Sequence, residues 1–192
     1  MKEVEILFKL NSSKKRTLEI LKKFSFLGLK KTKDIYFYDP LRENLKPQEK
    51  GRLKNAFRFR NKGGEFSIAY KIDHFKKDEW IYSDEYETKI ENSEVFLEIV
   101  KNLGFQELII VDSKKHIFTN SEYEIVFEEV KNLGFFLEVE KLQEVEDNKI
   151  TKEKENIRSF VYSLGLEIGE ELNKGKPELM LTERNTQQKN RD

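Results

Sequence analysis

The sequence predicts an α+β domain in which an antiparallel β-sheet is flanked by helices. Segments that alternate between apolar and polar residues recur along most of the chain, which is the pattern of strands with two different faces. Three other segments repeat apolar residues every three to four positions, as amphipathic helices do. The 192 residues are 37% hydrophobic and include 15 Phe and 7 Tyr, which is enough to build one core. One compact domain is therefore expected.

The composition argues against several classes of protein. The 36 basic residues balance the 36 acidic ones, so net charge gives no reason to expect nucleic acid or an anionic membrane as a partner. No apolar run approaches the roughly 20 residues of a membrane-spanning helix, and the N-terminus does not resemble a signal peptide. We therefore expect a cytoplasmic protein. The absence of cysteine excludes disulfides and thiolate metal sites, which leaves carboxylates and two histidines as side-chain metal ligands.

The first half of the chain reads as strand, helix and then a series of strands. Ser12 or Ser13 is a candidate N-cap for the helix, and Gly28 is expected to terminate it. The pair Gly63-Gly64 marks a hairpin turn. The expected strands cover residues 3–10, 34–38, 56–60, 66–71 and 80–90.

The second half repeats this pattern. Residues 17–24 and 96–103 resemble each other, so two similar halves are expected to close one sheet. Ser93 is expected to cap a second helix that ends at Gly104, and a third helix runs from about Thr151 to Gly165. The remaining strands are expected at 107–118, 122–130 and 135–142. Residues from Thr182 onward have little to bury, so we predict a domain over 1–181 and a disordered tail over 182–192.

Like-charge pairs two residues apart occur in four of the expected strands. Such pairs fit a solvated outer face, which is the ordinary arrangement in an antiparallel sheet. They also fit a closed barrel with helices outside, in which the charges line a tunnel. In that case arginine and lysine are natural ligands for phosphoryl oxygens and carboxylates for magnesium, so a polyanion with its metal is the expected occupant. The pairs are Glu3/Glu5, Arg58/Arg60, Glu85/Glu87 and Glu138/Glu140.

A series of motifs in this order resembles the CYTH family, also called triphosphate tunnel proteins, and most closely its CyaB-like branch. The resemblance runs from Glu3 to about Leu181. It begins with Glu3-Val4-Glu5, continues through Asp34 to Phe37, and reaches Glu128 to Glu140 near the end. Between these lie Phe57-Arg58-Phe59-Arg60, Ala69-Tyr70-Lys71 and Glu85-Tyr86-Glu87.

The resemblance implies an eight-stranded antiparallel β-barrel with flanking helices that binds a nucleoside triphosphate or another triphosphate with Mg²⁺ or Mn²⁺. It implies metal binding by Glu3, Glu5, Glu85, Glu87, Glu138 and Glu140. It implies triphosphate binding by Arg58, Arg60 and Lys71, with Lys115 and Lys9 as further candidates.

The expected activity is that of a class IV adenylate cyclase, which makes cyclic AMP and pyrophosphate from ATP. The alternatives are a triphosphatase acting on tripolyphosphate or thiamine triphosphate, and a catalytically weakened nucleotide or polyphosphate binder. Leu7, Ser83 and Ser113 stand where the family pattern has basic residues; this departure is the reason for the binder alternative, and the enzyme is the preferred interpretation. No residue is assigned to catalysis, no nucleic acid or membrane partner is expected, and a homodimer is compatible with the sequence.

Overall fold

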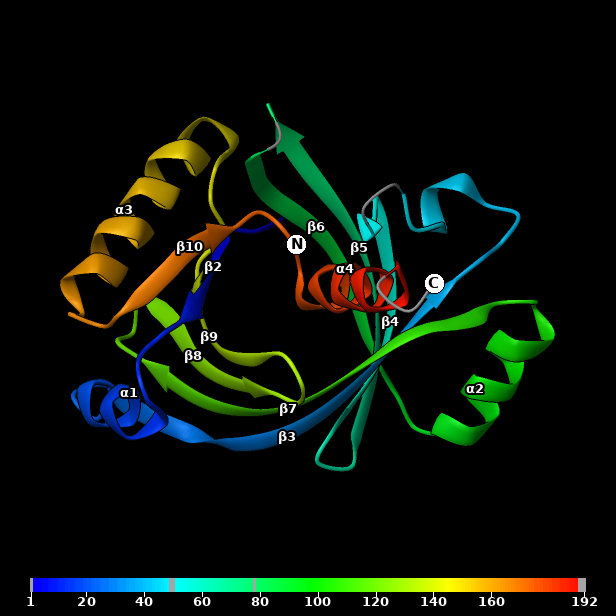
Figure 1. Cartoon of the computed structure of the whole chain (residues 1–192), viewed down its shortest axis with the longest axis horizontal. Helices are drawn as coiled ribbons and strands as arrows, with labels where there is room; N and C mark the ends of the chain where they lie inside the picture. Colours follow the sequence, from blue (N-terminus) through cyan, green and yellow to red (C-terminus); the bar gives the residue numbers. More distant parts are fainter. Residues whose placement is uncertain (1, 49–50, 78, 190–192) are drawn as a thin grey trace. The chain divides into compact units, whose positions relative to one another are not determined.

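The computed structural model describes residues 2–48, 51–77 and 79–189. Within them the chain forms ten strands, which belong to one sheet, and four α-helices (Figure 1). The strands are β1 (Lys2–Glu3), β2 (Glu5–Leu10), β3 (Ser25–Tyr38), β4 (Asn55–Lys62), β5 (Glu65–Lys76), β6 (Glu79–Ile90), β7 (Gln106–Thr119), β8 (Tyr123–Val130), β9 (Gly134–Lys141) and β10 (Ile168–Leu172). The helices are α1 (Lys14–Leu21), α2 (Ser93–Asn102), α3 (Ile150–Ser163) and α4 (Lys176–Lys189).

The chain divides into two compact units. Unit 1 contains residues 1–31, 74–84 and 113–173, and unit 2 contains residues 32–73, 85–112 and 174–192. The strands β3, β5, β6 and β7 each contain residues of both units.

The order of the strands in the sheet is β1-β6-β5-β4-β3-β7-β8-β9-β2-β10. The segment formed by β1 and β2 pairs with two different neighbours: Glu3 lies opposite Ser83 of β6, and Ile6 lies opposite Val139 of β9. One continuous segment therefore pairs with strands from distant places in the order of an antiparallel sheet that is flanked by helices. This confirms the predicted fold class, although the first expected strand is divided at Val4 and β10 is additional.

Helices cover one face of the unit 1 strands. On β2 the alternate residues Ile6, Phe8 and Leu10 are buried in the same cluster as Ile157 and Val161 of α3. Residues from β8 and β9 complete this cluster, and α3 contacts β2 and β9. Because side chains alternate between the two faces of a strand, the residues between these positions point to the opposite face.

In unit 2, helix α2 likewise covers one face of the strands. The ring of Phe96 on α2 lies 6.4 Å from the ring of Phe57 and 5.9 Å from that of Phe59, both on β4. The side chains of Arg58 and Arg60 alternate with these rings, and therefore lie on the face of the strand away from α2.

Two helix boundaries differ from the prediction. The first helix ends at Leu21, and Gly28 lies inside β3 with a φ of 142°, a backbone conformation that favours glycine. Asn92, not Ser93, caps α2 by accepting a hydrogen bond from the backbone N–H of Val95 at 3.0 Å. Both serine and asparagine are good N-cap residues, so residue type alone did not show which of these two neighbours caps the helix.

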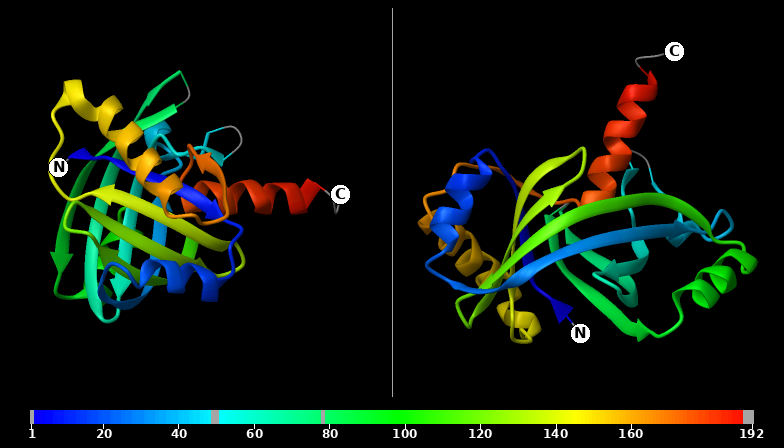
Figure 2. Two further views of the ribbon diagram at one scale, coloured as in Figure 1. Left: turned by 90° about the vertical axis from the view of Figure 1, so that its left-hand side faces the viewer. Right: turned by 90° about the horizontal axis from the view of Figure 1, so that it is seen from below.

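The predicted disordered tail is wrong for residues 182–189, which belong to α4 (Figure 2). The start of α4 is packed, because Leu181 is buried and Glu178 accepts hydrogen bonds from two backbone N–H groups. A packed first turn removes the cost of starting a helix, so polar residues can extend it. Residues 190–192 lie outside the described part of the chain.

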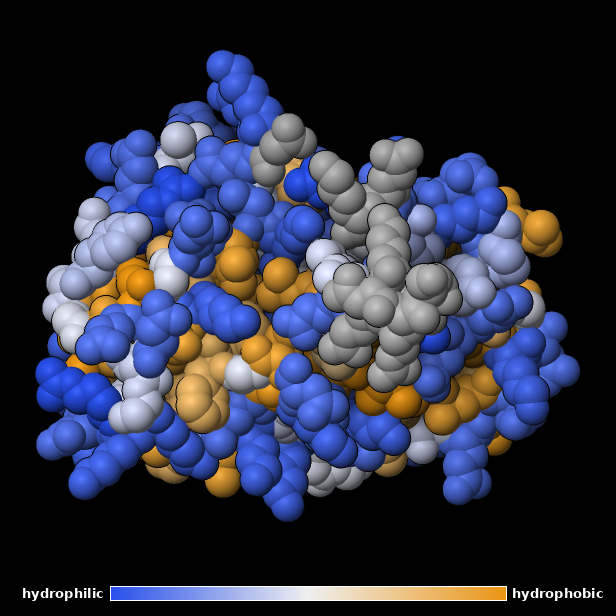
Figure 3. Space-filling model, in the orientation of Figure 1, coloured by the Kyte–Doolittle hydropathy of each residue, from blue (hydrophilic) through white to orange (hydrophobic). Residues whose placement is uncertain are grey.

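Hydrophilic side chains cover most of the face seen in Figure 3, with smaller hydrophobic areas between them. Among the described residues, none of the helices has the length and apolar character that crossing a membrane requires.

Candidate functional site

Six charged side chains in unit 2 form a cluster on the face of the sheet away from α2. Asp34 of β3 lies directly opposite Arg60 of β4 in the strand register, so the two side chains project to the same face. Arg58 projects to this face one pair further along. We call the set the Arg58 cluster: Asp34, Arg58, Arg60, Lys71, Glu85 and Glu87.

The cations of the Arg58 cluster are held by carboxylates. Arg60 binds Asp34 through two parallel hydrogen bonds of 2.8 and 2.7 Å. Arg58 donates to Glu85 at 2.8 Å and to Glu87 at 3.1 Å, and Lys71 Nζ lies 3.0 Å from the other oxygen of Glu85. Because each of the three cations is paired with a carboxylate, the cluster can be largely buried without leaving an uncompensated charge.

One donor in this cluster is left over. Arg58 is only 8% exposed, and its buried Nε has no hydrogen-bond acceptor among the residues that the structure describes. A buried donor without an acceptor costs free energy, and native proteins contain few of them. The Nε of Arg58 is therefore a donor that a further acceptor would satisfy.

The ionisation of this cluster is fixed by its surroundings. Burial raises the pKa of Tyr36, which lies opposite Arg58 in the β3–β4 register. Burial and the neighbouring Arg60 act to lower the pKa of Arg58, but Tyr36, Asp34 and Glu85 act in the other direction and the net change is upward. Arg58 therefore stays a cation and the Tyr36 hydroxyl stays a hydrogen-bond donor at neutral pH.

A second cluster lies in unit 1, on the face away from α3. Lys115 Nζ lies 3.7 Å from Glu128 and 3.7 Å from Glu138, and the Ser113 hydroxyl donates to Glu128 at 2.6 Å. Glu128 is 1% exposed. These four residues, the Lys115 cluster, show that charges on this face are buried and do not project into water.

Three glutamates form a row beside the Lys115 cluster. Glu5 lies opposite Glu140 across the β2–β9 pair, and Glu140 lies opposite Glu124 across the β8–β9 pair. Directly opposed like charges destabilise a sheet unless a cation lies nearby. The row therefore concentrates negative charge on this face, and Lys154 of α3 interacts electrostatically with Glu5.

A match to the family model of the CYTH domain covers residues 1–173. The chain belongs to the CYTH family. It is 36% identical over 146 residues to the putative adenylate cyclase MJ0240 of Methanocaldococcus jannaschii, an alignment that covers 73% of this chain and 77% of that protein.

Solved structures share the fold of this CYTH chain. The PH1819 protein of Pyrococcus horikoshii OT3 superimposes with a TM-score of 0.79 at 24% identity, over 94% of this chain and 99% of that one. HpAC1 of Hippeastrum, described as a putative adenylyl cyclase with a dominant triphosphatase activity, superimposes with a TM-score of 0.62 at 14% identity, over 96% of both chains.

The three departures from the CYTH pattern have structural explanations. Leu7 is buried opposite Glu138 and Leu172. The buried Ser83 accepts a hydrogen bond from the indole N–H of Trp80 at 3.0 Å, and Ser113 holds Glu128. These positions support their neighbours and contribute no positive charge.

The predicted site residues fall into two sets. Unit 2 brings together Arg58, Arg60, Lys71, Glu85 and Glu87. Unit 1 holds the rest: Lys115 contacts Glu138, Glu5 lies opposite Glu140, Glu3 pairs with Ser83, and Lys9 is exposed at its position opposite Phe136.

The prediction omitted Asp34, Tyr36, Glu124 and Glu128, although the first two belong to the Asp-x-Tyr-Phe motif and Glu128 begins the last motif. Glu124 had no local signal, because its place beside Glu140 depends on strand register.

Among the described residues, the structure contains no group of three or more acidic or histidine side chains that forms a metal cage by itself. Mg²⁺ commonly binds through one or two carboxylates and completes its shell with water and substrate phosphates. The opposed pair Glu5 and Glu140 fits that second mode of binding.

Proposed function

We propose that this CYTH protein binds a triphosphate and converts it in a metal-dependent reaction. The observation that carries the proposal is the buried Arg58 cluster, in which two arginines and a lysine project from neighbouring strands and Arg58 retains an unused Nε donor. Guanidinium groups bind phosphoryl oxygens with planar, two-pronged hydrogen bonds. The triphosphate exchanges carboxylate partners for phosphate partners around these cations.

Mg²⁺ or Mn²⁺ is the proposed cofactor, with Glu3, Glu5, Glu85, Glu87, Glu138 and Glu140 as candidate ligands. The opposed carboxylates Glu5 and Glu140 are the pair whose placement supports this most directly. Such a metal supplies charge neutralisation at phosphoryl oxygens. The residues of this chain hold the triphosphate in position, which supplies most of the acceleration in phosphoryl transfer.

The proposed reaction is the conversion of ATP to cyclic AMP and pyrophosphate. In it the ribose 3′ oxygen attacks the α-phosphorus and pyrophosphate leaves. The 36% identity to the putative adenylate cyclase of M. jannaschii favours this reaction.

A second candidate is triphosphate hydrolysis, in which water attacks the terminal phosphorus and orthophosphate leaves. The Hippeastrum structure described as having a dominant triphosphatase activity supports it. The two reactions require the triphosphate to be bound in the same way and differ in the oxygen that attacks.

One assay separates these reactions. The purified chain is incubated with ATP, tripolyphosphate or thiamine triphosphate, each with Mg²⁺ or Mn²⁺, and the products are separated. Cyclic AMP and pyrophosphate from ATP support the cyclase, whereas orthophosphate from any of the three supports the hydrolase.

Thermal unfolding with and without each ligand completes the test. A ligand at about 100 times its Kd stabilises the folded state by about 2.7 kcal/mol, so binding without turnover is visible as a raised Tm. A raised Tm without product identifies a binding protein. No turnover and no change in Tm with any of the ligands refutes the proposal.

A further inference from the structure

The Arg58 cluster has a further polar neighbour, the hydroxyl of Tyr36. Tyr36 lies directly opposite Arg58 in the β3–β4 register, and Asp34 lies two residues before it on the same strand. Because side chains alternate along a strand, Tyr36 projects to the same face as Asp34 and Arg58. The next residue, Phe37, projects to the other face, where its ring lies 5.6 Å from that of Phe57. Tyr36 therefore belongs to the charged face of these strands and not to the apolar face that α2 covers.

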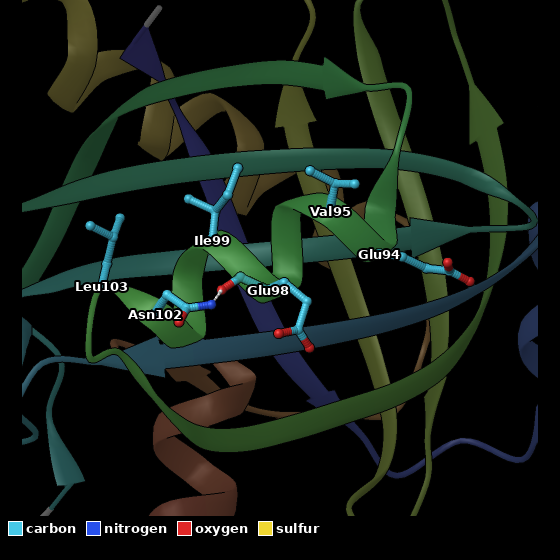
Figure 4. A pocket seen from close by; sticks show the side chains of 6 residues that line it. All are labelled: Glu94, Val95, Glu98, Ile99, Asn102 and Leu103. Atoms are coloured by element: carbon cyan, nitrogen blue, oxygen red, sulfur yellow. Dashed lines mark hydrogen bonds between the residues drawn. The ribbon is translucent and has the colours of Figure 1, made fainter.

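The pocket on the outer side of α2 has the wrong charge for an anion. In it, three apolar side chains are bordered by two carboxylates (Figure 4). Carboxylates repel a phosphate group, so this pocket does not fit a triphosphate. Its lining residues are Glu94, Val95, Glu98, Ile99, Asn102 and Leu103. Donors for a triphosphate are therefore expected on the opposite face of β4, where the Arg58 cluster lies.

The charges of the Arg58 cluster act directly on the Tyr36 hydroxyl. Burial raises the pKa of Tyr36, and Asp34 also acts to raise it. The cations Arg58, Arg60 and Lys71 act to lower the pKa, and the net change is upward. These charges come from the three neighbouring strands β3, β4 and β5. The hydroxyl therefore lies among them as a neutral hydrogen-bond donor.

The Tyr36 hydroxyl has no acceptor among the residues that the structure describes. The next tyrosine on the same strand, Tyr38, differs in this respect, because its hydroxyl donates to the side chain of Gln106 at 2.5 Å. The buried Nε of Arg58 also lacks an acceptor within the described ranges. Two unused donors, one neutral and one charged, therefore belong to directly opposed residues.

Two such donors fit a ligand group that consists of acceptors. The non-bridging oxygens of a phosphoryl group accept hydrogen bonds from charged and neutral donors. Neither a protonated phenol nor a guanidinium is an ordinary ligand of Mg²⁺, which prefers carboxylate, carbonyl and water oxygens. The pair formed by Tyr36 and Arg58 therefore fits the phosphate chain of a ligand better than it fits the metal.

We propose that Tyr36 is a triphosphate-binding residue, and that its hydroxyl donates a hydrogen bond to a phosphoryl oxygen of the triphosphate bound at Arg58. This inference rests on the proposed function, because it concerns the same site. It assigns the contact to the phosphate chain and not to the nucleoside. The contribution of Tyr36 is therefore the same for ATP and for tripolyphosphate.

Tyr36→Phe tests the proposal, because it removes the hydroxyl and keeps the ring. Isothermal titration calorimetry compares the variant with the wild type, using tripolyphosphate and a non-hydrolysable ATP analogue, each with Mg²⁺. The affinity should fall roughly tenfold for both ligands, as expected for one lost hydrogen bond to a charged group. A loss for the ATP analogue alone overturns the proposal, because the hydroxyl then contacts the nucleoside.

The wild type separates this inference from the proposed function. If the wild type binds both ligands and Tyr36→Phe binds them equally well, only the role of Tyr36 is refuted. If the wild type binds neither ligand, triphosphate binding and the role of Tyr36 fail together.

Urea unfolding without ligand distinguishes a binding role from a structural one. A hydroxyl without an acceptor does not stabilise the folded state, so Tyr36→Phe should unfold at a urea concentration no lower than the wild type. A lower midpoint shows that the hydroxyl has a partner within the protein, and this overturns the proposal. The control is Tyr86→Phe, the same change at a tyrosine of β6 that is 64% exposed, which should match the wild type in affinity and in stability.

Discussion

Arg58 lies between two aromatic residues in sequence, and its burial follows from that alternation. Phe57 and Phe59 pack toward α2, so Arg58 points to the other face, where Glu85 and Glu87 accept its hydrogen bonds. Removing the whole side chain would leave Glu85 with one buried cation fewer. We expect Arg58→Ala to destabilise the fold by about 3 kcal/mol, the usual cost of breaking a buried pair, so that variant cannot isolate ligand binding.

Arg58→Lys is the sharper test of ligand binding at the residue scale. Lysine keeps the positive charge but has no planar fork and no Nε donor. We expect triphosphate affinity to fall roughly tenfold, because a hydrogen bond to a charged group contributes about 1.5–3 kcal/mol. Isothermal titration calorimetry with a non-hydrolysable ATP analogue and Mg²⁺ measures this change.

The matched control is Arg184→Lys, which makes the same change at an exposed arginine of α4. Its affinity should equal that of the wild type. If Arg58→Lys also binds with wild-type affinity, Arg58 serves only to pair Glu85 and Glu87.

Serine residues illustrate what could not be predicted at the residue scale. Ser83 and Ser113 read as lost basic positions in the CYTH pattern. In the structure they are hydrogen-bond partners of Trp80 and Glu128. A serine is compatible with a lost basic position and with a structural hydrogen-bond partner, and only the surrounding structure distinguishes the two.

At the scale of elements, a buried carboxylate helps to attach α4 to its unit. Glu178 is 2% exposed; its two oxygens accept the backbone N–H of Gly175 at 2.7 Å and that of Leu53 at 2.8 Å. The first bond closes the start of α4 as in a capping box. The second joins α4 to the chain segment before β4, so Glu178 couples the helix to the rest of unit 2.

Burial raises the pKa of Glu178 from 4.5 to about 7, although the two backbone hydrogen bonds act to lower it. The folded state therefore holds a proton between these pH values that the unfolded state has released. The stabilisation is fully present below pH 4.5 and is lost as pH rises through 7.

We expect the stability of the wild type relative to Glu178→Gln to fall by up to about 3 kcal/mol between pH 5 and pH 8. Glutamine is neutral at both pH values, so it removes the titration. Urea unfolding of the two proteins across this pH range measures the change. The exposed Glu183→Gln on the same helix serves as the control, and a pH-independent difference for Glu178→Gln would contradict the assignment.

Helix ends were predicted less well than strands. The hairpin of β4 and β5 lies where the paired glycines and alternating residues placed it. The start of α2, which Asn92 caps, and the end of α1 at Leu21 were harder to predict. Several neighbouring residues are suitable at each position, and tertiary packing decides between them. The later residues of α4 have little helical signal of their own, and their helix continues from a start fixed by Glu178 and Leu181.

At the scale of the whole molecule, four strands run through both compact units. The strands β3, β5, β6 and β7 each contain residues of both units. Unfolding of one unit therefore disrupts strands that continue into the other unit. We expect a single cooperative unfolding transition.

Two probes check this expectation. Trp80 is the only tryptophan of the chain and lies in unit 1, whereas far-ultraviolet circular dichroism follows the secondary structure of the whole chain. The two urea transitions should coincide. A tryptophan transition at a different urea concentration would show that the units unfold independently.

The sequence by itself determined most of the strand segments, although not β10 or the first part of β3. It also determined which side chains share a face of each strand, because a period of two residues is a local property of the backbone. That local period is enough to place Arg58 with Arg60 on one face, and Glu138 with Glu140 on another. The tertiary structure decided which charges meet, such as Asp34 with Arg60, Lys115 with Glu138, and Glu5 with Glu140. These contacts depend on strand register, and several join segments far apart in the chain, which no local pattern encodes.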